Sequence, residues 1–192
     1  MPRLWNATIA AHREDVHGAI LDAAASLASE RGMLAVTMSA VAEQAGIGRA
    51  TLYKYFPDVE TILRSWHDRQ IATHLAQLTQ IYDGGGSALD RLRHVFDTYA
   101  FIRHEHHDPD LAAVLHRGSH LSHASGHLNA LMASLIREAA AAGAVRTDID
   151  PSELAVYCTH ALGAAASLPS KAAVRRLVDL TAAALHSTAP AQ

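Results

Sequence analysis

The side chains with the clearest capacity for chemistry lie in residues 37–56, which read TMSAVAEQAGIGRATLYKYF. Between Gln44 and Phe56 the chain carries two cations, Arg49 and Lys54, and no carboxylate. Guanidinium, ammonium and hydroxyl donors are the groups that bind the phosphates and base edges of duplex DNA. The segment therefore predicts a local basic surface on a chain whose formal net charge is -3.

Two short helices are expected to position these side chains. Residues 40–45 and residues 49–55 have helical character, and glycines stand in the turn between them. Small and aliphatic residues can bury the inner faces: Val41, Ala42, Ala45, Ile47 and Leu52. The outward positions of the second helix are Arg49, Thr51, Lys54 and Tyr55, with Tyr53 at an edge. This pattern indicates a helix-turn-helix, which presents its second helix to the major groove. A plain helical hairpin with exposed polar residues is the alternative.

Composition favours an all-α fold. The chain has 192 residues, of which 49% are hydrophobic and 18% charged, and it is rich in alanine, the best helix former. Its charge excludes a generally basic nucleic-acid coat protein. The single cysteine excludes an intrachain disulfide and a multi-cysteine zinc site. No stretch approaches the roughly 18 apolar residues of a membrane span, so we expect a cytoplasmic protein without a membrane partner. We also expect no cofactor.

Helical periodicity continues through the rest of the chain. Residues 1–12 contain helix breakers and predict a flexible arm before the first helix. Glycine, proline and N-cap residues bound the further helices. The predicted helices cover residues 14–31, 40–45, 49–55, 58–82, 87–104, 109–117, 128–142, 151–168 and 170–186.

The N-terminal part resembles the TetR/AcrR family of bacterial transcriptional regulators. The resemblance covers about residues 14–70 and rests on these residues: Ile20–Ala24, Arg31–Gly32, Thr37–Met38, Val41–Ala42, Ala45–Ile47, Thr51–Phe56, Glu60 and Leu63. It implies an N-terminal three-helix DNA-binding domain over residues 13–70 and a helical ligand-binding and dimerisation domain over residues 71–192. It also implies a homodimer that binds a palindromic double-stranded DNA operator and responds to a small-molecule effector, most commonly as a repressor.

The resemblance also implies a role for each outward residue. Arg49 is expected at base edges, and Thr51 and Tyr55 at phosphates. Tyr53 is expected at the DNA backbone or a thymine methyl, and Lys54 at a phosphate or base. Thr37 is expected to offer its hydroxyl to the DNA backbone.

Two positions depart from the family pattern. Val59 stands where a lysine is usual, which predicts one phosphate contact fewer and a shallower salt dependence. Gly48 stands where serine is usual, which removes a side-chain cap. Arg3 or Arg13 is a candidate to compensate.

The C-terminal part gives weaker expectations. Aromatic, polar and adaptable residues on helical faces predict an effector pocket lined by Phe96, Tyr99, Arg103, His116, His120 and Met132. Small and aliphatic residues of the last two helices predict a four-helix dimer interface made by Leu162, Ala165, Val174, Leu177, Val178 and Thr181. For both sets, packing inside the protomer is the alternative.

Histidines and the cysteine define the remaining alternatives. His116, His120, His123 and His127 would share one face of a continuous helix and could hold a metal or sense pH. Glycines and serines between them argue against that helix, so we expect no metal site. Cys158 and His160 are two residues apart on one helix and cannot pair, and no hydrolase or nucleotide motif is present, so we expect no enzyme. A helical adaptor that binds no DNA is the last alternative.

Overall fold

The computed structural model describes residues 2–32, 35–105 and 120–186, and the regular secondary structure in these ranges is helical. This confirms the predicted all-α fold. The chain divides into two compact units, one that ends at Gln70 and one that begins at Ile71. The helix predicted over residues 109–117 lies outside the described residues.

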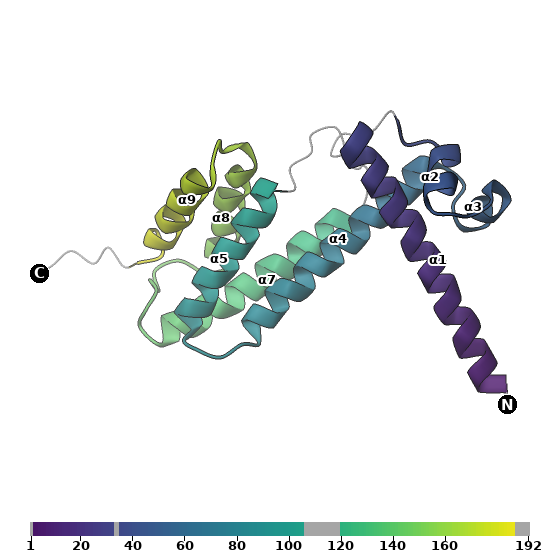
Figure 1. Ribbon diagram of the computed structural model, residues 1–192. Coiled ribbons are helices and arrows are strands. Elements are labelled where there is room, and N and C mark those ends of the chain that lie inside the picture. The colour runs from purple at the N-terminus through teal and green to yellow at the C-terminus, as the bar shows by residue number, and fades with distance from the viewer. Residues whose placement is uncertain (1, 33–34, 106–119, 187–192) are drawn as a thin grey trace, which may run out of the picture. The chain divides into compact units, whose positions relative to one another are not determined.

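The first unit contains α1 (Pro2–Arg31), α2 (Met38–Gln44), α3 (Arg49–Tyr55) and the first half of α4 (Val59–Tyr82) (Figure 1). Apolar residues one helical turn apart on α1 form one face, and this face shares one hydrophobic core with the other three helices. The fully or nearly fully buried side chains of this core include Ile20, Leu21, Ala24, Leu27, Val41, Leu52, Phe56 and Ile62.

Caps and turn glycines fix the ends of the short helices. Gly32 follows α1 with φ 81°, and Gly46 lies between α2 and α3 with φ 68°. This left-handed conformation is open to glycine and costly for other residues. The hydroxyl oxygen of Thr37 accepts a hydrogen bond from the backbone N–H of Ala40 at 3.2 Å and so caps α2. Asp58 does the same before α4, where its carboxylate accepts from the N–H of Thr61 at 2.7 Å.

Two helix starts differ from the sequence prediction. The prediction of a flexible arm over residues 1–12 was wrong from residue 2 onward, because α1 begins at Pro2. Proline is tolerated in a first helical turn, where its missing N–H costs nothing, and alanines follow it. Similarly, α7 begins at His120 rather than at residue 128 and includes Gly126. A single glycine costs only about 1 kcal/mol in a helix, which packing of the later turns can offset.

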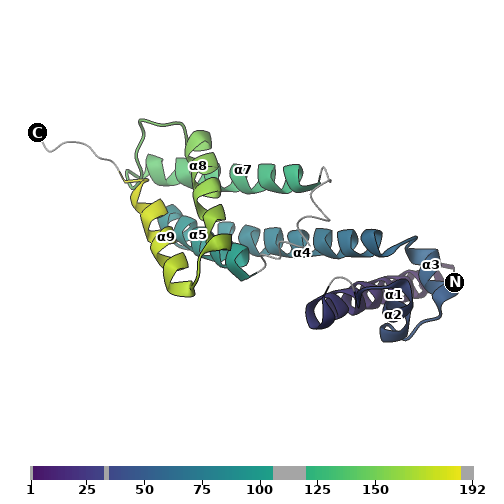
Figure 2. The same ribbon diagram turned by 90° about the horizontal axis from the view of Figure 1, so that it is seen from above.

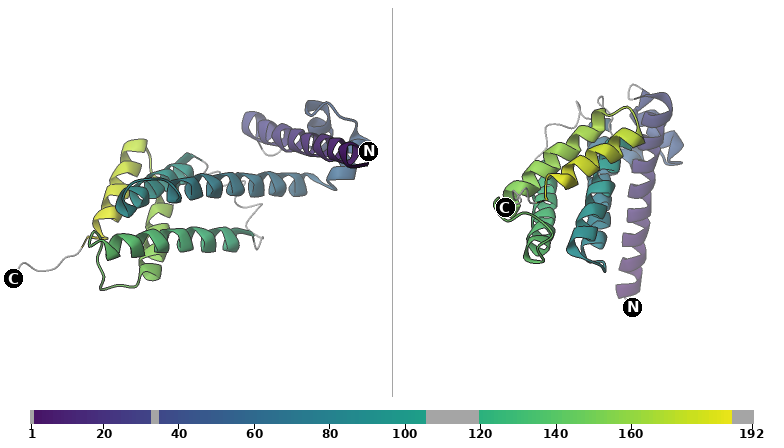
Figure 3. Two further views of the ribbon diagram at one scale, coloured as in Figure 1. Left: turned by 90° about the horizontal axis from the view of Figure 1, so that it is seen from below. Right: turned by 90° about the vertical axis from the view of Figure 1, so that its left-hand side faces the viewer.

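The second unit contains the rest of α4, α5 (Ala88–Glu105), α7 (His120–Ala141), α8 (Pro151–Gly163), the 3₁₀ helix η2 (Ala164–Ser167) and α9 (Lys171–Ala183). α8 and α9 run across the direction of α7 (Figures 2 and 3). α5 packs against α7, α8, η2 and α9, so it is the central helix of this unit. The predicted helix 151–168 is therefore an α-helix followed by a tighter 3₁₀ turn.

The core of the second unit is almost entirely apolar. It includes Phe96, Met132, Leu135, Ile136 and Leu162, all fully buried. Among the described residues, Thr181 is the only buried polar one, and its hydroxyl donates to the carbonyl oxygen of Leu177 at 2.8 Å. α4 is continuous from Val59 to Tyr82, so its residues belong to both units.

Candidate nucleic-acid interface

Burial of its inner face orients the second helix of the helix-turn-helix. Leu52 is fully buried from α3 and packs with Val41 and Ala42 of α2 in the core of the first unit. Because α3 has only seven residues, one buried position is enough to set which side faces out. Arg49 and Lys54 are exposed on that outward side.

The remaining predicted contact residues differ in exposure. Thr51 is exposed, and the Tyr53 side chain is 51% exposed, which is unusual for a large aromatic residue. Thr37 is exposed, and because its oxygen accepts the α2 capping bond, its O–H stays available to donate. Tyr55 is half-buried and packs against the core of the first unit. The six predicted residues thus lie on α3 and at the N-cap of α2.

The two cations of this surface have no ion-pair partner among the described residues. Neither Arg49 nor Lys54 forms an ion pair with any carboxylate in the described part of the chain. Both cations are on α3, which carries no acidic residue. Two unpaired cations beside hydroxyl donors can bind phosphate oxygens, and a guanidinium can also bind guanine through two hydrogen bonds.

Sequence reasoning missed the contacts that hold the two short helices in place. The side-chain amide of Gln44, at the end of α2, donates to the hydroxyl of Ser26 on α1 at 2.9 Å. His17 of α1 lies against the ring of Phe56, which follows α3, with 5.0 Å between ring centroids. These contacts join residues 18 and 39 positions apart, and no local pattern signals them.

The predicted effector-pocket residues fall into three groups. Phe96 and Met132 are fully buried in the core of the second unit. Tyr99 is half-buried and packs against that core, and its burial raises the pKa of the phenol although the charge of Arg103 opposes this. Arg103 is exposed. His116 and the side chain of His120 lie outside the described residues.

Most residues predicted at the dimer interface lie inside the protomer. Leu162, Ala165, Val174, Val178 and Thr181 are buried there, and Leu177 is partly buried. A side chain without exposed surface in the protomer adds no area to an interface between protomers. The large apolar side chains that α8 and α9 do expose are Val156, Tyr157 and Leu180, with 44%, 48% and 68% of their surface accessible.

Cys158 and His160 do not form a catalytic pair. Cys158 is fully buried, and burial raises the pKa of its thiol to about 12. His160 is exposed, and its Nδ1 lies 2.8 Å from the carbonyl oxygen of Val156. No cluster of three metal-binding side chains occurs among the residues described, and the side chains of His116, His120 and His123 lie outside them.

Comparison with known proteins agrees with a helix-turn-helix regulator. Residues 20–65 match the family described as bacterial regulatory proteins, tetR family. Residues 93–187 match the C-terminal domain of SbtR-like transcriptional regulators. The HTH-type transcriptional repressor KstR of Mycolicibacterium smegmatis is 40% identical over 73 residues, which cover 38% of this chain and 36% of KstR. The match thus spans about a third of that relative.

Solved structures with similar folds cover nearly the whole chain. A TetR-family regulator from Pectobacterium atrosepticum has a TM-score of 0.70 at 25% identity, over 91% of this chain and 92% of that one. FadR from Bacillus subtilis, in complex with stearoyl-CoA, has a TM-score of 0.63 at 15% identity, over 88% and 98% of the two chains.

The fold and the exposed basic helix define a helix-turn-helix transcription regulator rather than an enzyme. More particularly, the chain belongs to the TetR/AcrR family, since its N-terminal and C-terminal parts both match that family. In the described ranges, no helix is long and apolar enough to span a bilayer.

Proposed function

We propose that this protein is a ligand-responsive transcriptional repressor that binds a palindromic operator as a homodimer. The observation that carries the proposal is the surface of α3, where Arg49 and Lys54 are exposed and unpaired with the described carboxylates while Leu52 anchors the helix from behind. Arg49 reads base edges, and Thr37, Thr51 and Tyr55 bind phosphates. Tyr53 and Lys54 add backbone or base contacts. The name of the relative KstR, a transcriptional repressor, supports the direction of control.

Each of the two domains has its own function. Residues 13–70 form the DNA-binding domain, and residues 71–192 form the domain for effector binding and dimerisation. The separate apolar cores on either side of residue 70 support this division, because each core can hold its own helices together.

Dimerisation uses the outer faces of α8 and α9. Apolar surface is exposed on these faces by Val156, Tyr157 and Leu180, and water solvates it poorly. A second copy of the chain would cover this surface. The predicted interface residues Val174 and Val178 are buried in the core of the second unit, which holds α9 in place from inside the protomer. Two-fold symmetry then presents two copies of α3 to one operator.

Control by the effector acts through α4. The effector binds among α4, α5 and α7, where Phe96, Tyr99 and Met132 supply apolar and aromatic surface, and Arg103, His116 and His120 complete the predicted lining. A small molecule with an apolar portion suits the apolar core of the second unit, and the stearoyl-CoA bound by B. subtilis FadR is a ligand of that kind. Because α4 contains residues of both units, a shift of this helix changes the spacing of the two α3 helices.

The decisive experiment is selection of duplexes from a random library, followed by fluorescence anisotropy at several salt concentrations. A repressor of this type should select a near-palindrome with half-sites about 34–36 Å apart, and its affinity should fall as salt rises. Recovery of no preferred sequence, or binding insensitive to salt, would contradict the proposal. Once an effector is found, DNA must weaken effector binding by the same factor by which the effector weakens DNA binding.

A further inference from the structure

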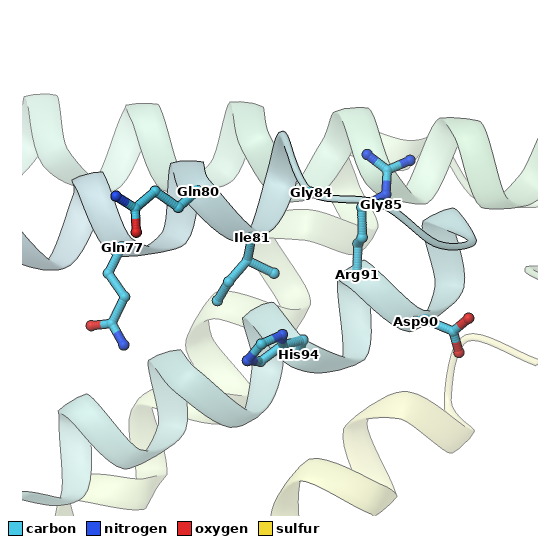
Figure 4. Close-up of a pocket in the computed structure, with 8 residues that line it drawn as sticks. All are labelled: Gln77, Gln80, Ile81, Gly84, Gly85, Asp90, Arg91 and His94. Atoms are coloured by element: carbon cyan, nitrogen blue, oxygen red, sulfur yellow. The ribbon is translucent and has the colours of Figure 1, made fainter.

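A surface pocket lies where α4 ends and α5 begins, and its wall contains none of the residues predicted for the effector site. Its volume is about 440 Å³, which falls in the roughly 300–1,000 Å³ range of small-molecule sites. Gln77, Gln80 and Ile81 of α4 line one side, Asp90, Arg91 and His94 of α5 the other, and glycines of the turn close the end (Figure 4).

The charged groups at this pocket already have partners. The guanidinium of Arg91 donates to the carbonyl oxygen of Tyr82 at 2.7 Å and to a carboxylate oxygen of Glu138 at 2.5 Å. The carboxylate of Asp90 accepts from the hydroxyl of Ser87 at 2.6 Å. Both charged groups point away from the space between Ile81 and His94 (Figure 4). The pocket therefore offers neither an unpaired cation for an anion nor a set of ligands for a metal.

The side-chain amides and the imidazole at this pocket, in contrast, are free to bind. Gln77, Gln80 and His94 are exposed and make no hydrogen bond to other residues that the structure describes. Each carboxamide offers donors and an acceptor, and a neutral imidazole offers one of each. Ile81 adds a partly buried apolar side chain, on which one face of a ring can pack.

We propose that this pocket binds an uncharged ring compound with hydrogen-bond donors and acceptors on its rim, the chemistry shared by a nucleoside and a monosaccharide. The ring lies on Ile81, and its rim groups bond to Gln77 and His94. This site is additional to the proposed effector site and does not depend on DNA binding.

The turn allows a side chain to be added at the pocket wall without straining the fold. A Cβ built on Gly85 meets no atom within 4 Å, and the backbone there is not left-handed. Gly85→Leu therefore adds a side chain to a residue of the pocket wall without a clash. Gly126 of α7 has equally open surroundings, so Gly126→Leu is the matched control.

The test is isothermal titration calorimetry of the full chain with adenosine and, separately, with methyl α-glucoside. We expect saturable binding of one probe, weakened about tenfold or more by Gly85→Leu and by the double variant Gln77→Ala, His94→Ala, a change of about 1.4 kcal/mol or more. Gly126→Leu should bind normally. Circular dichroism melts verify folding, and if Gly85→Leu fails to fold, the double variant decides. Absence of binding by both probes, or binding that these variants leave unchanged, overturns the proposal.

Discussion

At the scale of single residues, substitutions of Arg49 and Thr51 should distinguish recognition of bases from binding to the DNA backbone. Both are exposed on α3. Arg49→Ala should cost about 1–3 kcal/mol of operator binding and relax the preference for one base, because a guanidinium bonds O6 and N7 of guanine together. Thr51→Ala should weaken all sequences about equally, because phosphates are the same at every step. Anisotropy titrations with single-base operator variants measure both effects. An unchanged base preference in Arg49→Ala would show that Arg49 does not recognise a base.

Cys158 is expected to be chemically inert in the folded protein. The thiolate is the reactive form, and burial raises the pKa of this thiol to about 12, so almost no thiolate exists at pH 8. A thiol-specific reagent at pH 8 should label the native protein very slowly and the guanidinium-unfolded protein at the rate of a free cysteine. The two rates serve as each other's control. Equal rates would show that Cys158 is accessible in solution.

At the scale of elements, the cap of α8 makes stability depend on pH. The carboxylate of Asp150 accepts hydrogen bonds from the hydroxyl and backbone N–H of Ser152, the latter at 2.8 Å, and these bonds lower the pKa of Asp150 below 3.8. A carboxylate with a lowered pKa stabilises the fold above about pH 4 and loses this effect as pH falls through its folded pKa. Asp150→Ala should therefore lower the Tm at pH 7.

The difference in Tm between Asp150→Ala and the original chain should narrow as the pH is lowered below 3.8. Thermal melts from pH 7 to pH 3 follow this change, with Asp15→Ala, at an exposed position in the interior of α1, as the control. A difference that stays constant over the whole pH range would mean that Asp150 does not act through its charge.

The continuity of α4 gives a second prediction for an element. Ala72 is an exposed residue inside α4, just beyond the division at residue 70. Ala72→Pro should break the helix there at a cost of about 3 kcal/mol or more. Operator affinity should then fall, since we propose that α4 sets the spacing of the two α3 helices. Ala72→Gly costs only about 1 kcal/mol, keeps the hydrogen bonds and should bind normally. Fluorescence anisotropy with folded, dimeric protein measures the operator affinity of both variants. Full affinity in Ala72→Pro would argue against this role of α4.

At the scale of the whole molecule, the proposed dimer rests on exposed apolar area. Leu180→Asp puts a charge into the proposed contact between copies, where burial of an unpaired carboxylate is costly. The variant should sediment as a monomer and lose most of its operator affinity, because one half-site alone provides half of the contacts. Ala76→Asp places the same charge on an exposed face of α4 and should leave the dimer intact. Sedimentation velocity measures the outcome, and a dimeric Leu180→Asp would place the interface elsewhere.

The sequence by itself determined the all-α fold and the helix-turn-helix. The reason is that these features are local: the Thr37 cap, the left-handed Gly46 and the single inward Leu52 all act within one or two helical turns. Local signals also located α3 and α4, whose observed bounds differ from the predicted ones by at most one residue.

The tertiary structure decided which neighbour covers each helical face. Periodicity identified an apolar stripe on α9 but not whether another helix of the same chain or a second copy packs on it. In the fold, Val174 and Val178 face the protomer core and Leu180 faces solvent. Likewise, the pocket beside Ile81 depends on how α4 and α5 are placed, and the bond from Gln44 to Ser26 depends on the packing of α2 on α1. These contacts join residues far apart in the chain, so they arise only when the helices pack.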